Sequence, residues 1–235
     1  MPAEPQNAKP RQRRARGEPR RLLIAAAQDV FNRKGYTSAS TREIADHAEV
    51  SETLMFRYFG SKAGLFREAM VKPFVEVVDR DIDRRLANPR RFDEPREEAR
   101  ALIADMYDVF NKHRALSASL FAADVLTESE LAASGVFDEV RQQIDRLVEF
   151  GIEEAKSQGA AVTPEAHELA TRAMLSMVAG MSTHGGWTYG KKRPSRDEVI
   201  DEVTDWVMAR YLPDAAPAVT NNAKRQPTKG RKSKS

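Results

Sequence analysis

Few residues of this chain have the types and the spacing that catalysis or metal binding requires. His167 and Glu168 begin the H-E-x-x-H pattern that places two zinc ligands on one helix face, but Thr171 stands where the second histidine is needed. Residues 185–192 are close to a phosphate-binding loop, yet Lys192 stands where Ser or Thr would hold magnesium. Because the sequence has no cysteine, thiolate chemistry and cysteine-held metals are excluded. We therefore expect no enzyme activity, no metal site and no cofactor.

A second group of polar residues is better placed, at the starts of two short helices. Residues 40–43, Ser-Thr-Arg-Glu, form a capping box, in which the serine accepts an N–H of the first turn and the glutamate reaches back to the cap. Ser51 can cap a further short helix. Two short capped helices with a tight connection predict a helix-turn-helix, which places its second helix in a DNA major groove. The candidates for contacts with bases or phosphates are Thr41, Arg42, Glu52, Thr53 and Arg57.

Two alternatives stay open for this segment. An ordinary corner between two helices would use the same capping residues without any DNA contact. Glu52 could accept a hydrogen bond from a cytosine amine, or it could complement the helix dipole at the first turn. We favour the dipole role slightly.

The elements that position these residues are helical throughout. Apolar residues recur at helical spacing from residue 19 to residue 212, and no stretch alternates as a strand would. Glycines and prolines mark the breaks, among them Gly35, the pair Gly185-Gly186 and Gly190. The predicted helices are 19–34, 41–47, 52–58, 62–87, 94–111, 114–127, 136–158, 164–187 and 195–212. The predicted fold class is all-α, with about nine helices and a small N-terminal module on a larger body.

Charge is divided unevenly along the chain. Residues 1–21 carry seven basic and two acidic residues, and residues 213–235 carry six basic and one acidic, although the net charge is only +3. Both ends lack aromatic residues and contain only one branched apolar residue, Val219, which predicts disorder and suits a polyanion partner. The alternative is that the tails only aid solubility. The longest apolar run, residues 22–27, is far shorter than the roughly 18 residues that a membrane span needs, so we expect a soluble, cytoplasmic protein.

A dense, gap-free pattern runs from residue 19 to about residue 72. It consists of Ile24, Ala27, Phe31, Gly35-Tyr36, Thr41, Ile44-Ala45, Ala48, Val50-Ser51, Tyr58-Phe59-Gly60-Ser61-Lys62 and Leu65-Phe66. In this pattern the segment resembles the TetR family of bacterial transcription regulators. The resemblance implies a basic arm at 1–18, a three-helix DNA-binding domain at 19–66, a larger helical domain for effector binding and dimerisation at 67–212, and a basic tail at 213–235.

The resemblance also implies residue roles on the DNA side. Positions matching Tyr58 and Lys62 usually contact backbone phosphates in the family, and residues 51–53 match the start of the recognition helix. Phe56 stands where the family commonly has tyrosine, so one phenolic hydrogen bond to DNA is missing. Thr53 and Leu54 also depart from the family pattern, which bears on base contacts and not on the fold. The full predicted DNA-binding set is Thr41, Arg42, Ser51, Glu52, Thr53, Phe56, Arg57, Tyr58 and Lys62.

In the family, the remaining helices bind a small-molecule effector and form a homodimer. Large, soft side chains of the middle helices, together with one arginine, are candidates for the effector site because methionine adapts to irregular apolar ligands. These candidates are Met106, Tyr107, Phe110, Phe121, Phe137, Arg141, Ile144, Met174 and Met177. One broad face of the last helix suits a dimer interface, through Val199, Val203, Trp206, Val207 and Arg210. For both sets, packing inside the chain's own core is the alternative.

The sequence thus predicts a homodimeric, sequence-specific DNA-binding regulator of transcription. We expect a repressor that a small apolar ligand of unknown identity releases from a palindromic operator. The alternative is a constitutive or architectural DNA-binding protein that uses its basic tails without a ligand switch. A helical enzyme is a third reading, for which the sequence offers no catalytic constellation.

Overall fold

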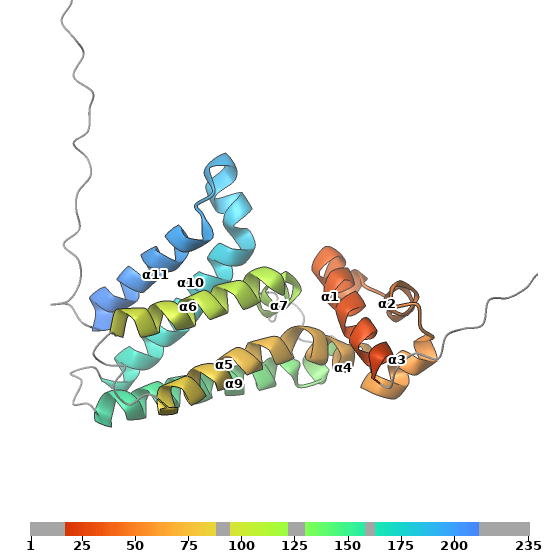
Figure 1. Ribbon diagram of the computed structural model, residues 1–235, viewed down its shortest axis with the longest axis horizontal. Coiled ribbons are helices and arrows are strands. Elements are labelled where there is room, and N and C mark those ends of the chain that lie inside the picture. The colour runs from red at the N-terminus through yellow and green to blue at the C-terminus, as the bar shows by residue number, and fades with distance from the viewer. Residues whose placement is uncertain (1–16, 88–94, 122–129, 158–162, 212–235) are drawn as a thin grey trace, which may run out of the picture.

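The computed structural model describes residues 17–87, 95–121, 130–157 and 163–211, and within these ranges the chain is helical and contains no strand (Figure 1). The predicted all-α fold class is confirmed. The basic arm and the basic tail lie outside the described residues, apart from residues 17 and 18. The expectations for both ends, and the domain boundaries, therefore stay predictions.

Serine caps determine where the N-terminal helices begin. The first three helices are α1 (Glu18–Ser38), α2 (Thr41–His47) and α3 (Glu52–Phe59). The Ser40 hydroxyl accepts the N–H of Glu43 at 3.1 Å, and the Ser51 hydroxyl accepts the N–H of Leu54 at 3.3 Å. Helix α1 leaves helical geometry at Gly35, where φ is 75°. This is where the sequence predicted its end, and a further turn follows to Ser38.

An aromatic cluster forms the centre of the N-terminal core. The next helix, α4 (Lys62–Phe66), brings Phe66 against α1. The Phe66 ring centroid lies 5.1 Å from that of Phe31 and 5.3 Å from that of Tyr36, with edge-to-face geometry in both pairs. Met55 of α3 is fully buried. These contacts hold three short helices that could not be stable alone.

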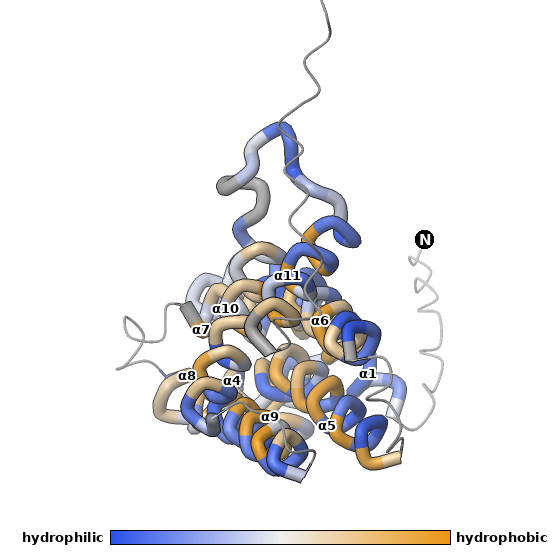
Figure 2. Tube along the Cα trace, turned by 90° about the vertical axis from the view of Figure 1, so that its left-hand side faces the viewer, coloured by the Kyte–Doolittle hydropathy of each residue, from blue (hydrophilic) through white to orange (hydrophobic). Residues whose placement is uncertain are grey.

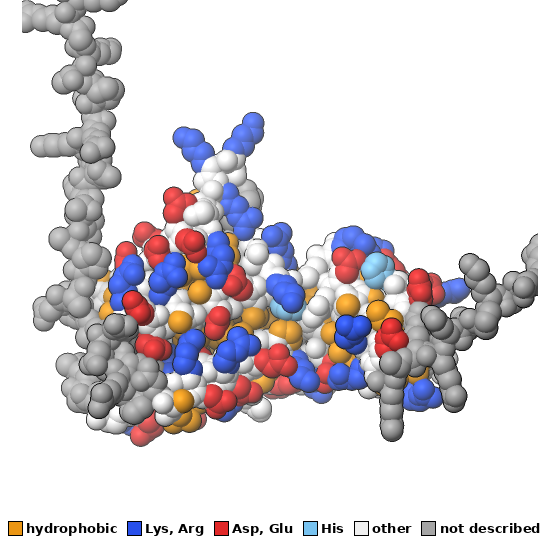
Figure 3. All heavy atoms as spheres, in the orientation of Figure 1, with side chains coloured by type: hydrophobic (Ala, Val, Ile, Leu, Met, Phe, Trp, Pro, Cys, Tyr) orange, Lys and Arg blue, Asp and Glu red, His pale blue; other side chains and the backbone are white. Residues whose placement is uncertain are grey.

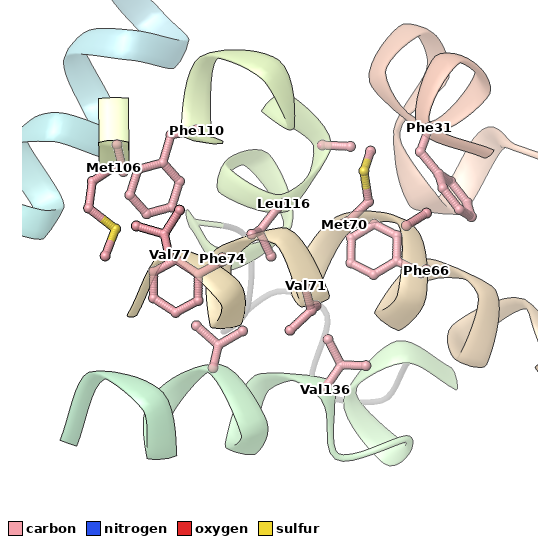
Figure 4. Packing of buried hydrophobic residues seen from close by; sticks show 14 of the residues in the cluster. Phe31, Phe66, Met70, Val71, Phe74, Val77, Met106, Phe110, Leu116 and Val136 are labelled. Carbon is pink, nitrogen blue, oxygen red and sulfur yellow. The ribbon is translucent and has the colours of Figure 1, made fainter. Parts of the chain in front are cut away.

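The core continues from this domain into the body without a break. Helix α4 passes through a π-helical turn (Arg67–Val71) into α5 (Lys72–Ala87), so the predicted helix 62–87 is confirmed as one path with a wider turn inside it. Met70 and Phe74 are buried along this path, with Phe31 on one side and Phe110 on the other (Figure 4). One hydrophobic cluster therefore joins the two parts.

The body is a bundle of long helices. They are α6 (Pro95–Lys112), α7 (Arg114–Phe121), α8 (Glu130–Ala133), α9 (Val136–Ser157), α10 (Pro164–Tyr189) and α11 (Arg196–Tyr211), with a 3-10 turn, η3 (Gly190–Lys192), before α11. Helices α5 and α9 run side by side, and α10 packs on α6, α9 and α11 (Figure 1). Figure 2 shows the hydrophobic sides of α5 and α9 turned toward the interior. The body thus buries one side of each long helix, as amphipathic helices require.

The body differs from the prediction in one additional helix and in one predicted break. The short helix α8 was not predicted. The predicted break at Gly185-Gly186 is wrong, because α10 continues to Tyr189 and ends at Gly190, where φ is 57°. Two helical glycines cost about 1 kcal/mol each, which the buried side of a long helix offsets. The helix ends at a glycine with a positive φ.

The surface of the body interleaves opposite charges. Arg100 of α6 binds Asp201 of α11 at 2.7 Å, and Arg196 of α11 binds Asp108 of α6 at 2.7 Å. Blue and red side chains accordingly alternate over these two helices, and basic side chains cap the projecting connection between α10 and α11 (Figure 3). Among the described residues, no helix combines the length and apolar character needed to cross a membrane.

Candidate nucleic-acid interface and body cavity

Helix α3 lies at the end of the molecule opposite α11 (Figure 1). Met55 is buried on its inner side and anchors the helix. Thr53, Phe56 and Arg57 are exposed and share the outer side, because residues three and four apart lie on one helix face. The structure thus brings these three predicted DNA-contacting residues together.

A hydrogen bond ties the starts of α2 and α3. The Thr41 hydroxyl donates to the Glu52 carboxylate. Glu52 is half-buried in the first turn of α3, where a negative charge complements the helix dipole. Thr41 and Glu52 therefore hold the angle between the two helices, a role that the sequence did not predict for either.

The capping box at α2 is only half formed. Ser40 caps the helix as expected, but the Glu43 carboxylate binds Lys34 of α1 at 2.8 Å and Arg33 at 3.2 Å. The hydrogen bond from Lys34 lowers the pKa of Glu43. The expected reach of Glu43 back to the cap is replaced by this link to α1. Arg42 beside it is exposed, in a position to meet a phosphate.

The two predicted phosphate-contacting residues differ in their surroundings. Tyr58 is 38% exposed at the end of α3. Lys62 is half-buried at the start of α4, with its ammonium 4.4 Å from the centre of the Tyr36 ring and 3.4 Å from the carbonyl of Thr37. Burial lowers the pKa of Lys62 from its ordinary value. Lys62 thus packs on the domain core through Tyr36 and Thr37.

A cavity of about 180 Å³ lies in the body, far along the chain from α3. Five helices supply its wall: α5, α6, α9, α10 and α11. The apolar lining residues are Ala99, Leu102, Ile103, Leu147, Ala170, Met174, Val207 and Met208, and the polar ones are Arg85, His167 and Thr171. Such a mostly apolar enclosure with a few polar groups is typical of a small-molecule site.

The positive charge of Arg85 on the cavity wall is neutralised by two carboxylates. Arg85 binds the buried carboxylate of Asp81 at 2.8 Å and that of Glu154 at 3.2 Å. Burial, and then the charge of Arg85, lower the pKa of His167, so its imidazole is neutral at pH 7. Gly151 makes room for this ring, because a Cβ there would lie 2.3 Å from Nε2 of His167. The cavity wall therefore carries no charge without an opposite partner beside it.

Most predicted effector-site residues do not line this cavity. Met174 does, whereas Met106, Tyr107 and Phe110 are buried in the general core. Phe137, Ile144 and Met177 pack against that core, and Arg141 is exposed with Asp138 3.2 Å away. The side chain of Phe121 lies outside the described part of the chain. The effector-site set therefore stays a prediction, because periodic apolar residues mark the interior of a helix bundle and do not show where its packing leaves space.

Sequence reasoning missed all three polar residues of the cavity wall. Arg85 was not considered, and His167 and Thr171 were considered only as a failed zinc pattern. Their spacing of four residues places both on one face of α10. The sequence could have indicated this part of the wall, because a histidine and a threonine lie on the same helix face as Met174. No group of three metal-ligating side chains occurs among the described residues.

The residues of the predicted dimer face of α11 lie in different surroundings: some are buried, one lines the cavity and one is exposed. Val199 and Val203 are buried within their own chain, which corrects the expectation for both, because the apolar side of α11 packs on α6 and α10. Val207 lines the cavity. Trp206 is 42% exposed and points outward, and the side chain of Arg210 lies outside the described residues.

Comparison with known proteins agrees with this geometry. Residues 23–69, which span most of α1 and all of α2 to α4, match the family described as bacterial regulatory proteins, tetR family. The chain is 30% identical over 122 residues to the HTH-type transcriptional activator FasR of Mycolicibacterium smegmatis, covering 50% of this chain and 52% of that protein. It is 36% identical over 64 residues to the HTH-type transcriptional repressor BdcR of Escherichia coli, covering 26% and 32%. The alignments thus span about half, or less, of the length of these relatives.

The fold of the whole described chain also has counterparts among solved structures. The transcriptional regulator FadR from Bacillus subtilis, in complex with stearoyl-CoA, superposes with a TM-score of 0.57 at 18% identity, over 81% of this chain and 98% of that one. At this identity the likeness concerns the fold alone. The family match thus assigns residues 23–69 to the bacterial regulatory proteins of the tetR family, and the structural likeness shows that the described chain shares its fold with FadR.

Proposed function

We propose that this chain is a homodimeric transcription regulator that binds a near-palindromic operator through α3 and acts in the cytoplasm. The observation that carries the proposal is the outer face of α3, where Thr53, Phe56 and Arg57 project from a helix capped by Ser51. A recognition helix placed in this way reads one half-site, and two-fold symmetry supplies the second. The most direct support is the family match over α1 to α4.

We propose that an exposed face of α10 packs against a second copy of the chain. Leu169 is 68% exposed, and it shares one face with Ser176 and Gly180. A Cβ built at Gly180 meets nothing within 4 Å, so this side of α10 is open in the single chain. Trp206 is exposed on the neighbouring helix α11. Small residues beside a large apolar one allow two helices to approach closely, and aromatic residues are enriched in interfaces.

The substitution Gly180→Leu tests the dimer without disturbing the single chain. Leucine is a better helix former than glycine and meets open space at this position. We expect the variant to keep its helical content and to sediment as a monomer, with at least a tenfold loss of operator affinity. The variant Ala118→Leu is the matched surface control, because it also places a leucine at an exposed helical position, on α7. A Gly180→Leu protein that remains dimeric would contradict the proposed interface.

The cavity is the proposed effector site. Its volume of about 180 Å³ is similar to that of an engineered protein cavity of about 150 Å³ that binds benzene. Because Arg85 is already paired with Asp81 and Glu154, a charged ligand would find no uncompensated partner. We therefore propose a compact, neutral and mainly apolar effector. FadR of Bacillus subtilis, by contrast, was solved with a long-chain acyl thioester.

Helix α5 is the proposed link between the two sites. Arg85 lies in its last turn, and its other end continues through the π-helical turn into α4. An effector that fits the cavity better when α4 has moved will lower DNA affinity, and one without that preference will change nothing. A hundredfold release requires about 2.7 kcal/mol of difference in effector binding between the two states. We propose release, and hence repression, as the outcome.

Genomic selection of bound fragments tests the function as a whole. The full-length protein is incubated with sheared genomic DNA at about 150 mM salt, where non-specific binding is suppressed. A short palindromic motif is the expected result. Fragments bound evenly, with affinity that depends only on salt, would contradict the proposal and would favour binding through the basic ends of the chain. A gene reporter beside the strongest site then separates repression from activation.

A further inference from the structure

Phe56 is an apolar side chain on an otherwise polar helix face. It is 45% exposed, although its neighbour Met55 is fully buried and Phe59 packs against the core. Thr53 and Arg57 flank it on the same face. The domain therefore keeps one phenyl ring outside its core, at the centre of the surface that faces DNA in the proposed function.

The chemistry of this ring restricts what it can contact in a major groove. A phenyl group has no hydrogen-bond donor or acceptor, so it cannot bind a phosphate or the polar edge of a base. The apolar group that base pairs display in the major groove is the C5 methyl of thymine. Glu52 is held by the Thr41 hydroxyl, which leaves Phe56 between a small hydroxyl and a guanidinium.

We propose that Phe56 is a specificity-determining residue that packs on the C5 methyl of a thymine in each operator half-site. The inference rests on the proposed function, since it requires α3 to lie in the major groove. Arg57 beside it can reach a guanine or a phosphate, so the ring supplies selectivity for thymine next to a charged contact. Contact between the ring and a deoxyribose would be independent of sequence, and this difference makes the proposal testable.

The experiment removes one methyl group at a time from the DNA. In the selected operator, each thymine is replaced singly by deoxyuridine, which keeps the base pair and lacks only the C5 methyl. For the unaltered protein we expect one or two positions in each half-site where the replacement weakens binding about fourfold, the effect of one buried carbon. Replacing the symmetry-related thymine as well should give about sixteenfold.

Two variants assign the effect to the ring. Phe56→Ala should bind the thymine operator more weakly and should no longer distinguish thymine from deoxyuridine at those positions. Because Phe56 is exposed, this variant should keep the melting temperature of the parent. Tyr58→Phe is the matched control: it removes a hydroxyl from the neighbouring aromatic residue and should leave the ratio of the two affinities unchanged.

Each remaining result overturns the proposal in a recognisable way. A parent protein that binds its operator specifically but ignores every deoxyuridine would refute the role of Phe56 and leave the regulator function standing. Sensitivity that persists in Phe56→Ala would assign the thymine contact to another residue. Binding without any sequence preference would overturn the proposed function and this inference together.

Discussion

The outer face of α3 and the cavity of the body are built in opposite ways. On α3, exposed residues stand on a short helix whose cap, Ser51, and buried anchor, Met55, lie within a few positions of them. The cavity wall comes from five helices spread between residues 85 and 208, and its charged residue, Arg85, is paired with Asp81 and Glu154. The first surface is local and open to a large charged partner. The second depends on the tertiary fold and suits a small neutral one.

The largest effect is expected from a substitution in the core that the two regions share. Phe66→Ala deletes a fully buried ring that packs on Phe31 and Tyr36, and Met70 beside it continues into the body. We expect the free energy of unfolding to fall by about 3–5 kcal/mol, in a single transition. Urea unfolding followed by circular dichroism measures both quantities. Two separate transitions would show that the DNA-binding helices and the body are stable independently.

A second test uses the pH dependence of stability at the corner between α6 and α7. Burial, and then the charge of Lys112, lower the pKa of His113 to about 4. In the unfolded chain this pKa is about 6.5, so between these values the unfolded state binds a proton that the folded state does not. Stability should therefore be fully present above about pH 6.5 and should fall by about 3 kcal/mol as the pH drops to about 4.

The variant His113→Asn isolates this contribution from that of the carboxylates. Its free energy of unfolding should depend less on pH between 4 and 6.5 than that of the parent, because asparagine does not titrate. Chemical denaturation at five pH values gives both curves. Parallel curves would mean that His113 has the same pKa in the folded and the unfolded protein.

The difference between the two regions also explains what could be predicted from the sequence. Caps such as Ser40 and Ser51 act within three residues, so the helix-turn-helix and its exposed residues followed from local spacing. Apolar periodicity placed Phe110 and Val203 on the apolar faces of their helices and predicted an effector site and a dimer interface there, but it could not separate core from cavity or from interface. The hydrogen bond between Thr41 and Glu52 joins two helices, and its geometry depends on how they cross.

A third prediction changes the cavity and leaves α3 untouched. In Gly151→Ala the new methyl overlaps the imidazole of His167, whose Nε2 lies 2.3 Å from the built Cβ. We expect a loss of about 1–3 kcal/mol in stability from this overpacking, with operator affinity retained and effector response reduced. The double variant Gly151→Ala/His167→Ala removes the overlap and should recover most of the stability. Additive losses in this double-mutant cycle would contradict a direct contact between the two positions.

The smallest expected effect concerns a link between the two regions. The Asn32 amide of α1 donates to the carbonyl of Lys112 at 2.7 Å, and its carbonyl accepts the N–H of Ala115 at 3.1 Å. One side chain of the DNA-binding domain thus bridges the end of α6 and the start of α7. Because Asn32 is exposed, Asn32→Ala should cost only about 1 kcal/mol of stability.

The effect of the same substitution on coupling should exceed its effect on either site alone. Asn32 touches neither the outer face of α3 nor the cavity, so operator affinity without effector and effector affinity without DNA should both stay near those of the parent. If the bridge transmits movement of the body to α1, the ratio of operator affinities with and without effector should shrink. Coupling is reciprocal, so the effect of operator DNA on effector affinity must shrink by the same factor. An unchanged ratio would leave the path through α5 and α4 as the connection between the two regions.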